Sequence, residues 1–288
     1  MQKIGDTLVP RIGLGTYRLK GEAAQKIVYD AVKMGYRHID TASVYKNEQD
    51  IGRAISKLIE EQVVRREELF VTSKIAPKDQ GFEKAQSAIR ASLEKLGPAV
   101  GYIDLMLVHW PGSQGLKPDN PLNKENRIGT MKALHEAYKN GLIKAIGVSN
   151  FNIYHFEGID VPIHLNQFEF HPLLWTGETR KLLEFCHSRN IVVGAYSCLG
   201  EGSLLNPEAY PELGKVSQEL GCSIAQVLIA WALVKNTIVM PKASSSARLK
   251  ENLDAGKITL NSQQIETIDK IVERVGSVKY CWDPSKIV

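Results

Sequence analysis

The sequence predicts one α/β domain built as a (β/α)8 barrel, the TIM barrel, with an N-terminal β-hairpin. Short apolar runs, which suit buried strands, alternate with segments of helical periodicity along most of the 288 residues. Several of these runs are apolar almost throughout, as in parallel sheets that are covered on both faces. Barrels of about 250 residues are common as single domains, and no linker or change of composition divides this chain. We therefore expect residues 1–288 to form one domain.

The N-terminal region predicts the hairpin and the first two helices. Residues 3–17 carry apolar residues on both sides of a Gly-Asp turn signal, which indicates a hairpin. Apolar residues then recur at helical spacing over 22–34, and the strand that follows ends at Asp40. Asn47 can cap a second helix, whose apolar face runs over 51–59.

The stretch 13–16, Gly-Leu-Gly-Thr, interrupts the strand pattern of the hairpin region. It is not a dinucleotide-binding fingerprint, because Arg18 stands in the place of the third glycine and no strand–turn–helix unit surrounds it. A doubly wound sheet, the alternative architecture, would need such a phosphate-binding turn and an open edge. The barrel is the simpler interpretation.

The remaining chain continues the alternation of strands and helices. With the strand that ends at Asp40, eight strands are expected, the others over 69–74, 102–109, 143–150, 164–170, 191–197, 237–242 and 257–260. Helices are expected over 82–96, 127–139, 178–189, 224–234 and 262–275. The polar stretch 111–125 indicates a surface loop, and Gly141 is a suitable C-cap for the helix before it.

Composition narrows the class of protein. Hydrophobic residues make up 43% of the chain, enough for a large core. The net charge of +4 is too small to indicate nucleic acid or an anionic membrane as a partner. The four cysteines are not closely spaced, so no metal site is predicted and a reducing compartment is favoured. The N-terminus lacks the apolar run of a signal peptide, and the longest apolar run, 227–234, is too short to span a bilayer, so we expect a cytoplasmic protein.

Polar side chains gather at the ends of the expected strands, where (β/α)8 barrels carry their active sites. They are Asp40, Lys74, His109, Ser149 with Asn150, Gln167 with Glu169, Tyr196 with Ser197, and Lys242. Tyr45 follows Asp40 in the turn after its strand. We therefore predict that Asp40, Tyr45, Lys74 and His109 meet at one end of the barrel.

A phenol in this group can act as a proton donor. Its pKa is about 10 in water, and a nearby cation lowers that pKa by favouring the phenolate. Taken singly, each residue has a structural explanation: Asp40 as a turn residue, Tyr45 as packing, Lys74 as a rim charge, His109 as a structural histidine. Lys74 also fits a Schiff-base lysine. Only the joint pattern favours an active site.

Three segments of the chain resemble the aldo-keto reductase family, of the aldose reductase-like type with a short substrate loop. The segment 35–42 (GYRHIDTA) is similar to its first signature, and 147–151 (GVSNF) to a segment that contacts the nicotinamide. The segment 240–242 (MPK), followed by 248–252 (RLKEN), resembles its last signature near the adenosine phosphate. The resemblance covers about residues 13–252, and the three motifs together are highly specific.

The resemblance implies NADPH-dependent reduction of aldehydes and ketones, as in an NADP-dependent alcohol dehydrogenase or aldehyde reductase. Tyr45 would be the general acid, with its pKa lowered by Lys74, and Asp40 would hold and polarise Lys74. His109 would orient the carbonyl group. The pocket wall would include Tyr17, Trp110 and Trp282, with Tyr17, His109 and Trp110 as substrate contacts.

The same resemblance implies the cofactor site. Ser149, Asn150 and Gln167 would hold the carboxamide, Tyr196 would stack on the nicotinamide, and Lys242 with Arg248 would pair with the 2′-phosphate, which favours NADPH over NADH. Glu251 and Asn252 would reach the adenine. The whole set of implied cofactor contacts is Thr16, Ser149, Asn150, Gln167, Tyr196, Ser197, Leu199, Lys242, Ser244, Arg248, Glu251 and Asn252.

The chain departs from the family pattern at several positions. Tyr17 stands where many members have tryptophan, Ala76 where aldose reductase has tryptophan, and Ala243 where serine is frequent. Tyr17 keeps the pocket wall aromatic and adds a hydroxyl, Ala76 implies a wider pocket, and Ala243 removes one phosphate hydrogen bond, which weakens the expected preference for NADP. The loop 199–214 is short, which implies few specificity contacts. We expect a monomer that acts on a small-molecule carbonyl compound, and we leave the place of residues 278–288 open.

Two other functions fit the same sequence. A barrel of this kind can serve as a binding or structural protein, since fold does not determine function. Alternatively, Lys74 could form a Schiff base in an aldolase. Retention of all four predicted catalytic residues favours the reductase.

Overall fold

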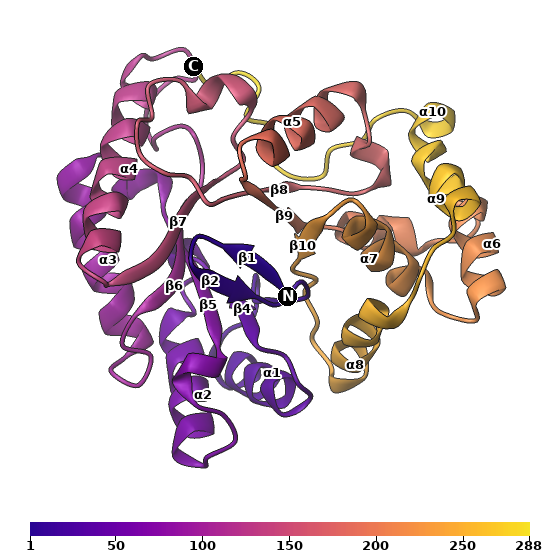
Figure 1. Ribbon diagram of the computed structural model, residues 1–288, viewed down its shortest axis with the longest axis horizontal. Coiled ribbons are helices and arrows are strands. Elements are labelled where there is room, and N and C mark those ends of the chain that lie inside the picture. The colour runs from indigo at the N-terminus through magenta and orange to yellow at the C-terminus, as the bar shows by residue number, and fades with distance from the viewer.

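A computed structural model describes residues 1–288. Eight parallel strands form a curled sheet in which each strand pairs with the next in the chain, and helices surround it (Figure 1). The (β/α)8 fold predicted from the sequence is confirmed. The strands are β3 Leu14–Gly15, β4 His38–Asp40, β5 Phe70–Ile75, β6 Ile103–Val108, β7 Ile143–Ser149, β8 Leu165–Glu169, β9 Val192–Tyr196 and β10 Thr237–Val239.

The first and last strands close the barrel through a few contacts. Bridges pair Ile12 with Val239 and Gly15 with Lys242, and the Gly13 amide donates to Val239 O at 2.8 Å. The prediction of a strand over 257–260 is wrong, because the eighth strand is β3. A strand of two residues is too short to show a periodic pattern in the sequence. Its close approach to the chain after β10 requires glycine, because a Cβ at Gly15 would lie 2.7 Å from Met240 O.

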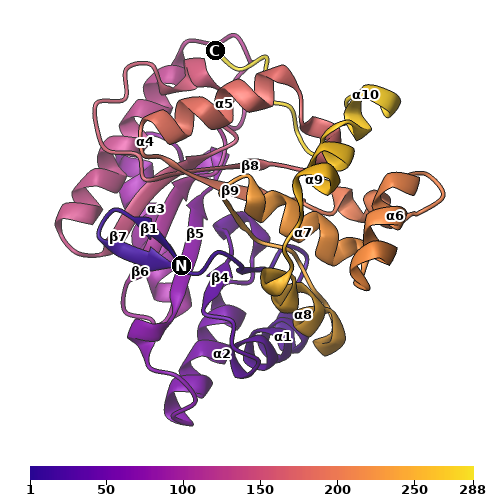
Figure 2. The ribbon, with the colours of Figure 1, turned by 45° about the vertical axis from the view of Figure 1, so that its right-hand side comes forward.

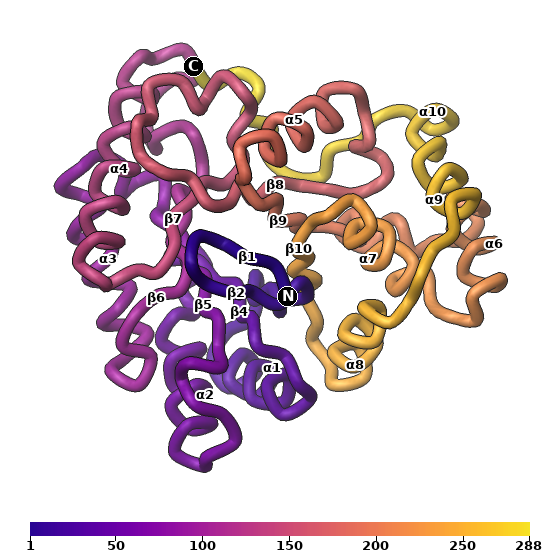
Figure 3. The backbone as a smooth tube through the Cα atoms, viewed as in Figure 1, coloured from indigo at the N-terminus to yellow at the C-terminus, as the bar shows by residue number.

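The predicted N-terminal hairpin is present as β1 Gln2–Ile4 and β2 Thr7–Val9, which pair antiparallel. It lies across one end of the barrel (Figure 3). Ile4 and Val9 are buried and join a cluster with residues such as Leu105 that point into the barrel from its strands. Apolar side chains therefore seal the amino end, and the opposite end is left for polar groups.

Ten helices surround the sheet (Figure 2). They are α1 Gly21–Lys33, α2 Glu48–Glu60, α3 Phe82–Leu96, α4 Leu122–Lys139, α5 Gly177–Ser188, α6 Pro211–Leu220, α7 Ile224–Val234, α8 Ser246–Asp254, α9 Ser262–Asp269 and α10 Ile271–Val275. The predicted bounds of α3 and α7 are confirmed. The helix expected over 127–139 begins earlier, the one over 262–275 is two helices, and α6 and α8 were not predicted.

Asn47 stands at the N-cap of α2, but its side chain does not cap the helix. Its Oδ1 accepts from Thr41 Oγ1 at 2.7 Å, and its Nδ2 donates to the carbonyls of Thr16 and Leu19, so it ties the loop after β4 to the loop after β3 instead. No single helix is long and apolar enough to cross a membrane. Helices α6 and α7 have the necessary length and composition only when they are taken together, and they meet at a bend of 92°.

Two buried histidines, His38 and His155, make folding sensitive to acid. Burial lowers the pKa of each to about 4, with Lys74 and Arg127 respectively adding to the effect. In the unfolded chain both titrate near 6.5. As the pH falls from there toward 4, the unfolded state binds protons that the folded state does not, so stability falls by up to about 1.4 kcal/mol per pH unit for each histidine.

Urea denaturation at several pH values checks this expectation. The free energy of unfolding should fall between pH values of about 7 and 5, and His38→Gln, which keeps a polar group near Thr72, should reduce that slope. An identical slope in the variant would contradict the role of His38.

Candidate active site

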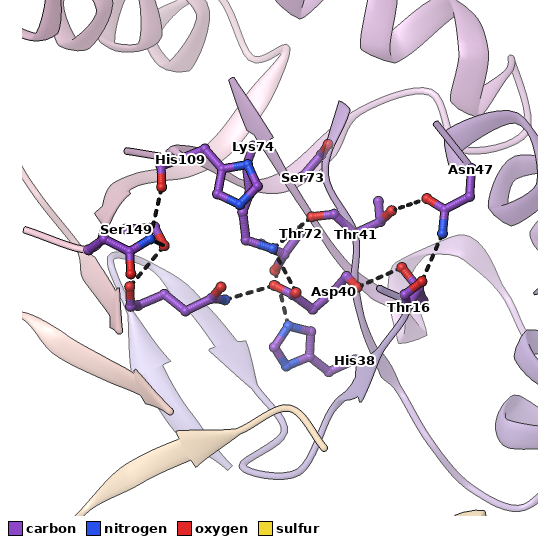
Figure 4. A network of polar contacts seen from close by, with 12 residues as sticks. Thr16, His38, Asp40, Thr41, Asn47, Thr72, Ser73, Lys74, His109 and Ser149 are labelled. Carbon is purple, nitrogen blue, oxygen red and sulfur yellow. Dashed lines mark hydrogen bonds and ion pairs between the residues drawn. The ribbon is translucent and has the colours of Figure 1, made fainter. Parts of the chain in front are cut away.

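The site is built around Asp40 and Lys74, at the carboxyl ends of β4 and β5. Asp40 pairs in register with Thr72, and Lys74 lies two residues further, so both side chains point into the barrel (Figure 4). Lys74 Nζ donates to Asp40 Oδ2 at 2.7 Å and to Thr41 O at 2.8 Å. The side chain of Lys74 has no exposed surface and that of Asp40 only 6%.

The buried ion pair is completed by a third strand. Gln167, on β8, donates from Nε2 to Asp40 Oδ1 at 2.8 Å, so both carboxylate oxygens have partners. Burial lowers the pKa of Lys74, whereas the Asp40 charge and its hydrogen bond oppose that shift. A buried pair of this kind survives only when its remaining polar atoms are satisfied, and here they are.

Tyr45 and His109 lie beside this pair. Tyr45 ends the 3-10 turn Ser43–Tyr45 after β4, which Ser43 Oγ ties to Lys74 O at 2.9 Å. Lys74 Nζ is 5.1 Å from the centre of the Tyr45 ring, and the His109 ring lies 5.7 Å from it, edge to face. The structure thus brings together the four residues that the sequence predicted to meet.

The pKa of Tyr45 is shifted in the opposite direction from the one predicted, and the pKa of His109 is shifted as well. Burial raises the pKa of Tyr45 well above its ordinary value, and the charge of Asp40 adds to this. The expected lowering by Lys74 is not found, because the ammonium is neutralised by a carboxylate 2.7 Å away. Burial, helped by Lys74, lowers the pKa of His109 to about 3. At neutral pH both rings are therefore uncharged, and the phenol carries its proton.

A row of amides and hydroxyls continues from this group across β7, β8 and β9. Ser149 Oγ donates to Gln167 O at 2.9 Å, and Asn150 Nδ2 donates to His109 O at 3.0 Å. Asn150 has a φ of 64°, a left-handed conformation that asparagine tolerates. Tyr196 OH donates to Asn150 Oδ1 at 2.6 Å. The predicted carboxamide-binding residues and Tyr196 thus form one connected row.

Thr16, one of the predicted cofactor contacts, is buried beside the end of β4. It has no exposed surface, and its Oγ1 and amide both donate to Asp40 O, at 2.9 and 3.0 Å. Thr16 thus supports the end of β4 next to the Asp40 carboxylate, and its contact with a cofactor stays a prediction.

A second, cationic group lies at the start of α8. Lys242, Ser244 and Arg248 are exposed there, and Ser245 Oγ accepts from the Arg248 amide to cap the helix. Lys250 and Lys257 pair with Asp254, whereas Lys242 and Arg248 form no salt bridge. A helix N-terminus flanked by free cations suits a phosphate group. Glu251 is half-buried and Asn252 buried further along α8, and Ser197 and Leu199 lie in the loop after β9.

Aromatic side chains surround the mouth of the site. Tyr17 is 48% exposed, and its ring lies 5.1 Å from that of Tyr45. Trp110, next to His109, meets the edge of Trp282 with ring centres 5.9 Å apart. Tyr17 and Trp110, two of the predicted pocket walls, are thus near the predicted catalytic residues.

Sequence reasoning left two parts of this face without a role. Glu169 belongs to the polar strand ends, but no partner was assigned to it. Residues 278–288 were left open, and the structure places Cys281 Sγ 3.5 Å from Ser197 Oγ. The polar ending of β8 was the available signal for Glu169; nothing local indicated which distant segment it binds.

Comparisons with known proteins agree with this geometry. The model of the Aldo/keto reductase family matches residues 11–273. Glyoxal reductase of Bacillus subtilis is 38% identical over 275 residues, covering 93% of this chain and 91% of that protein. The 9,11-endoperoxide prostaglandin H2 reductase of Trypanosoma cruzi is 36% identical over 275 residues, 93% and 90% of the two chains.

Solved structures with a similar fold are also aldo-keto reductases. An aldo-keto reductase from a Medee basin deep-sea metagenome library superimposes with a TM-score of 0.85 at 34% identity, covering 98% of each chain. A Bombyx mori aldo-keto reductase in complex with NADP has a TM-score of 0.81 at 30% identity, covering 93% of this chain and 91% of that one.

Proposed function

The chain belongs to the aldo/keto reductase family, and we propose that it is an NADPH-dependent aldehyde reductase with Tyr45 as its proton donor. The observation that carries the proposal is the position of the uncharged Tyr45 phenol between the His109 ring and the buried Asp40–Lys74 pair. NADPH, when bound, supplies a hydride to the carbonyl carbon. The residues of the chain have to bind and orient the carbonyl group and protonate its oxygen.

Tyr45 and His109 share the work at that oxygen. Both rings are uncharged, so the Tyr45 hydroxyl and an N–H of His109 can each donate a hydrogen bond to the carbonyl oxygen. As negative charge develops there, Tyr45 Oη gives up its proton. The phenolate that remains lies near the Lys74 ammonium, whose position is held by Asp40 and Thr41 O. Lys74 thus stabilises the product state of the transfer, although it does not lower the pKa of the resting phenol.

The cofactor residues follow from the polar row and the cationic group. We assign Ser149, Asn150 and Gln167 to the carboxamide, with Tyr196 stacking on the nicotinamide ring. Ser197, Leu199 and Ser244 line the path to Lys242 and Arg248, which are exposed and unpaired and so suit a 2′-phosphate. Glu251 and Asn252 are assigned to the adenine end. The donor set fits NADPH without rearrangement of any salt bridge.

A Schiff-base role for Lys74 is disfavoured. The Lys74 ammonium has no exposed surface and donates to Asp40 Oδ2 at 2.7 Å and to Thr41 O at 2.8 Å, so its nitrogen is engaged and offers no open approach to a carbonyl carbon. A Schiff base requires the neutral amine. Borohydride should therefore not trap a carbonyl compound on Lys74.

The proposed function is tested by following the oxidation of NADPH with a panel of aldehydes and ketones, repeated with NADH. Turnover that is faster with NADPH supports it. If NADPH binds but no carbonyl compound is reduced, a binding or structural role replaces it.

Removal of the two cations should weaken NADPH selectively. We expect Lys242→Ala and Arg248→Ala each to raise the KM for NADPH about 10- to 100-fold, as for a lost charge-assisted hydrogen bond, with little effect on the KM for NADH. Lys250→Ala is the matched control, because Lys250 is on the same helix but pairs with Asp254. Equal effects on NADPH and NADH would contradict the assignment of the 2′-phosphate to this place.

A further inference from the structure

The last residues of the chain cross the carboxyl-end face of the barrel. After α10 they run past α5 to the top of α4, where the chain ends (Figures 1 and 2). The far end is held by main-chain contacts: Tyr154 OH donates to Ser285 O at 2.9 Å, and the Val288 amide donates to Pro118 O at 3.0 Å. At the near end the Val278 amide donates to Leu173 O at 3.3 Å and Tyr280 packs against the core, and the Glu169 side chain binds the residues between.

Glu169, the last residue of β8, binds this segment with its carboxylate. Oε1 accepts from the Tyr280 amide at 2.7 Å and contacts His171 Nε2 at 3.0 Å. Oε2 accepts from the Cys281 amide at 3.1 Å and lies 3.2 Å from Lys279 Nζ. The Glu169 side chain has no exposed surface. Three consecutive residues of the segment are therefore attached to one buried carboxylate.

This attachment determines what faces the site. Next to the bound amides, Cys281 Sγ lies 3.5 Å from Ser197 Oγ, beside the Tyr196 end of the polar row. The following residue, Trp282, is 76% exposed, and its ring forms an edge-to-face pair with that of Trp110, with centres 5.9 Å apart. The Trp282 ring is mostly exposed, so its position depends on the backbone on either side, which Glu169 holds at residues 280 and 281.

We propose that Glu169 is a positioning residue that places Trp282 as the outer wall of the substrate pocket, and so favours carbonyl compounds with large aromatic groups. The inference rests on the proposed reductase function. Glu169 touches neither the substrate nor the reacting atoms; it acts through residues 280–282. An aromatic ring that reaches Trp110 and Trp282 gains contact area there, whereas a small aldehyde at Tyr45 does not reach them.

Glu169→Gln tests this role. Glutamine has the shape of glutamate, but its NH2 group would face one of the two backbone N–H groups that the carboxylate now binds, so one of those hydrogen bonds is lost. With saturating NADPH, we expect the KM for naphthaldehyde to rise about tenfold, because contacts that bind the remote ring equally in the ground state and the transition state are lost. The kcat for both aldehydes and the KM for propionaldehyde should change less than about twofold. Trp282→Ala should give the same split. The double variant should be no worse than Trp282→Ala, because the two residues act in series.

Amide hydrogen exchange gives a readout that needs no turnover. In Glu169→Gln, the amides of Tyr280 and Cys281 should exchange faster, while those of the buried helix α7 stay as in the unaltered protein. Glu48→Gln is the matched control: Glu48 is 1% exposed, accepts from Ser73 Oγ, and does not touch the segment. It should change neither the exchange at residues 280–281 nor the naphthaldehyde KM.

The outcomes separate this inference from the proposed function. If the unaltered protein reduces neither aldehyde, the reductase function fails. If exchange at Tyr280 and Cys281 is unchanged in Glu169→Gln, or if kcat falls equally for both aldehydes, Glu169 is structural and the positioning role is overturned. Additive effects in the double variant would also overturn it.

Discussion

Tyr45→Phe should lower kcat by about 10²- to 10⁴-fold, the usual contribution of a general acid, and leave the Kd for NADPH unchanged. The substitution removes only the Oη atom. The phenylalanine ring retains its contacts with Tyr17 and His109, so the pocket keeps its shape. Single-turnover reduction of an aldehyde measures the loss, and quenching of NADPH fluorescence measures cofactor binding.

Tyr29→Phe is the matched control for this variant. Its hydroxyl lies on α1 and binds Glu61, away from the site. We expect its turnover to equal that of the unaltered protein. Turnover retained in Tyr45→Phe would remove Tyr45 from the role of proton donor and would leave His109, the other nearby hydrogen-bond donor, as the acid to test.

Lys74→Met should lower both stability and activity. The substitution leaves the Asp40 carboxylate buried with only the Gln167 amide as a side-chain partner. Removal of one member of a buried ion pair costs about 3–5 kcal/mol, because the other charge remains uncompensated. The free energy of unfolding in urea near neutral pH measures the loss, and the aldehyde assay should show turnover close to background.

A double variant separates the two effects. In Asp40→Asn/Lys74→Met both charges are gone, so much of the lost stability should return, since replacement of both partners is often nearly neutral. Turnover should stay low, because no ammonium stabilises the Tyr45 phenolate. If the double variant is as unstable as Lys74→Met, the unpaired charge of Asp40 is not the cause of the instability.

Several elements of the fold could be predicted because their signal is local. Helices α3 and α7 have the predicted bounds, since each is a continuous segment with a clear beginning and end. Strand β3 was missed because two residues show no periodicity, and only their pairing with β4 and the bridges on the β10 side make them a strand. Helices α6 and α8 were missed for a related reason, since each was considered as a loop or a motif and not as a periodic segment.

The residues of the site also divide into those with a local signal in the sequence and those whose partners lie far away in the chain. Asp40, Lys74 and His109 could be picked out because each is a polar residue at the end of an apolar run. The bond from Gln167 to Asp40 joins residues 127 positions apart, and nothing near either residue indicates it. Glu169 showed the same polar ending, but its partners at residues 279–281 lie in a segment with no periodic pattern.

The sequence by itself determined the barrel, the end at which its polar residues gather and the chemical types available there, because alternation along a strand and helical spacing are properties of neighbouring residues. Only the tertiary structure decided the closure between β3 and β10, the place of the last residues over the site and the ionisation of Tyr45. A pKa depends on how far water is excluded and on which charges lie within a few ångströms. The Lys74 charge, expected to act on Tyr45, is instead neutralised by Asp40, a partner whose distance the order of residues does not reveal.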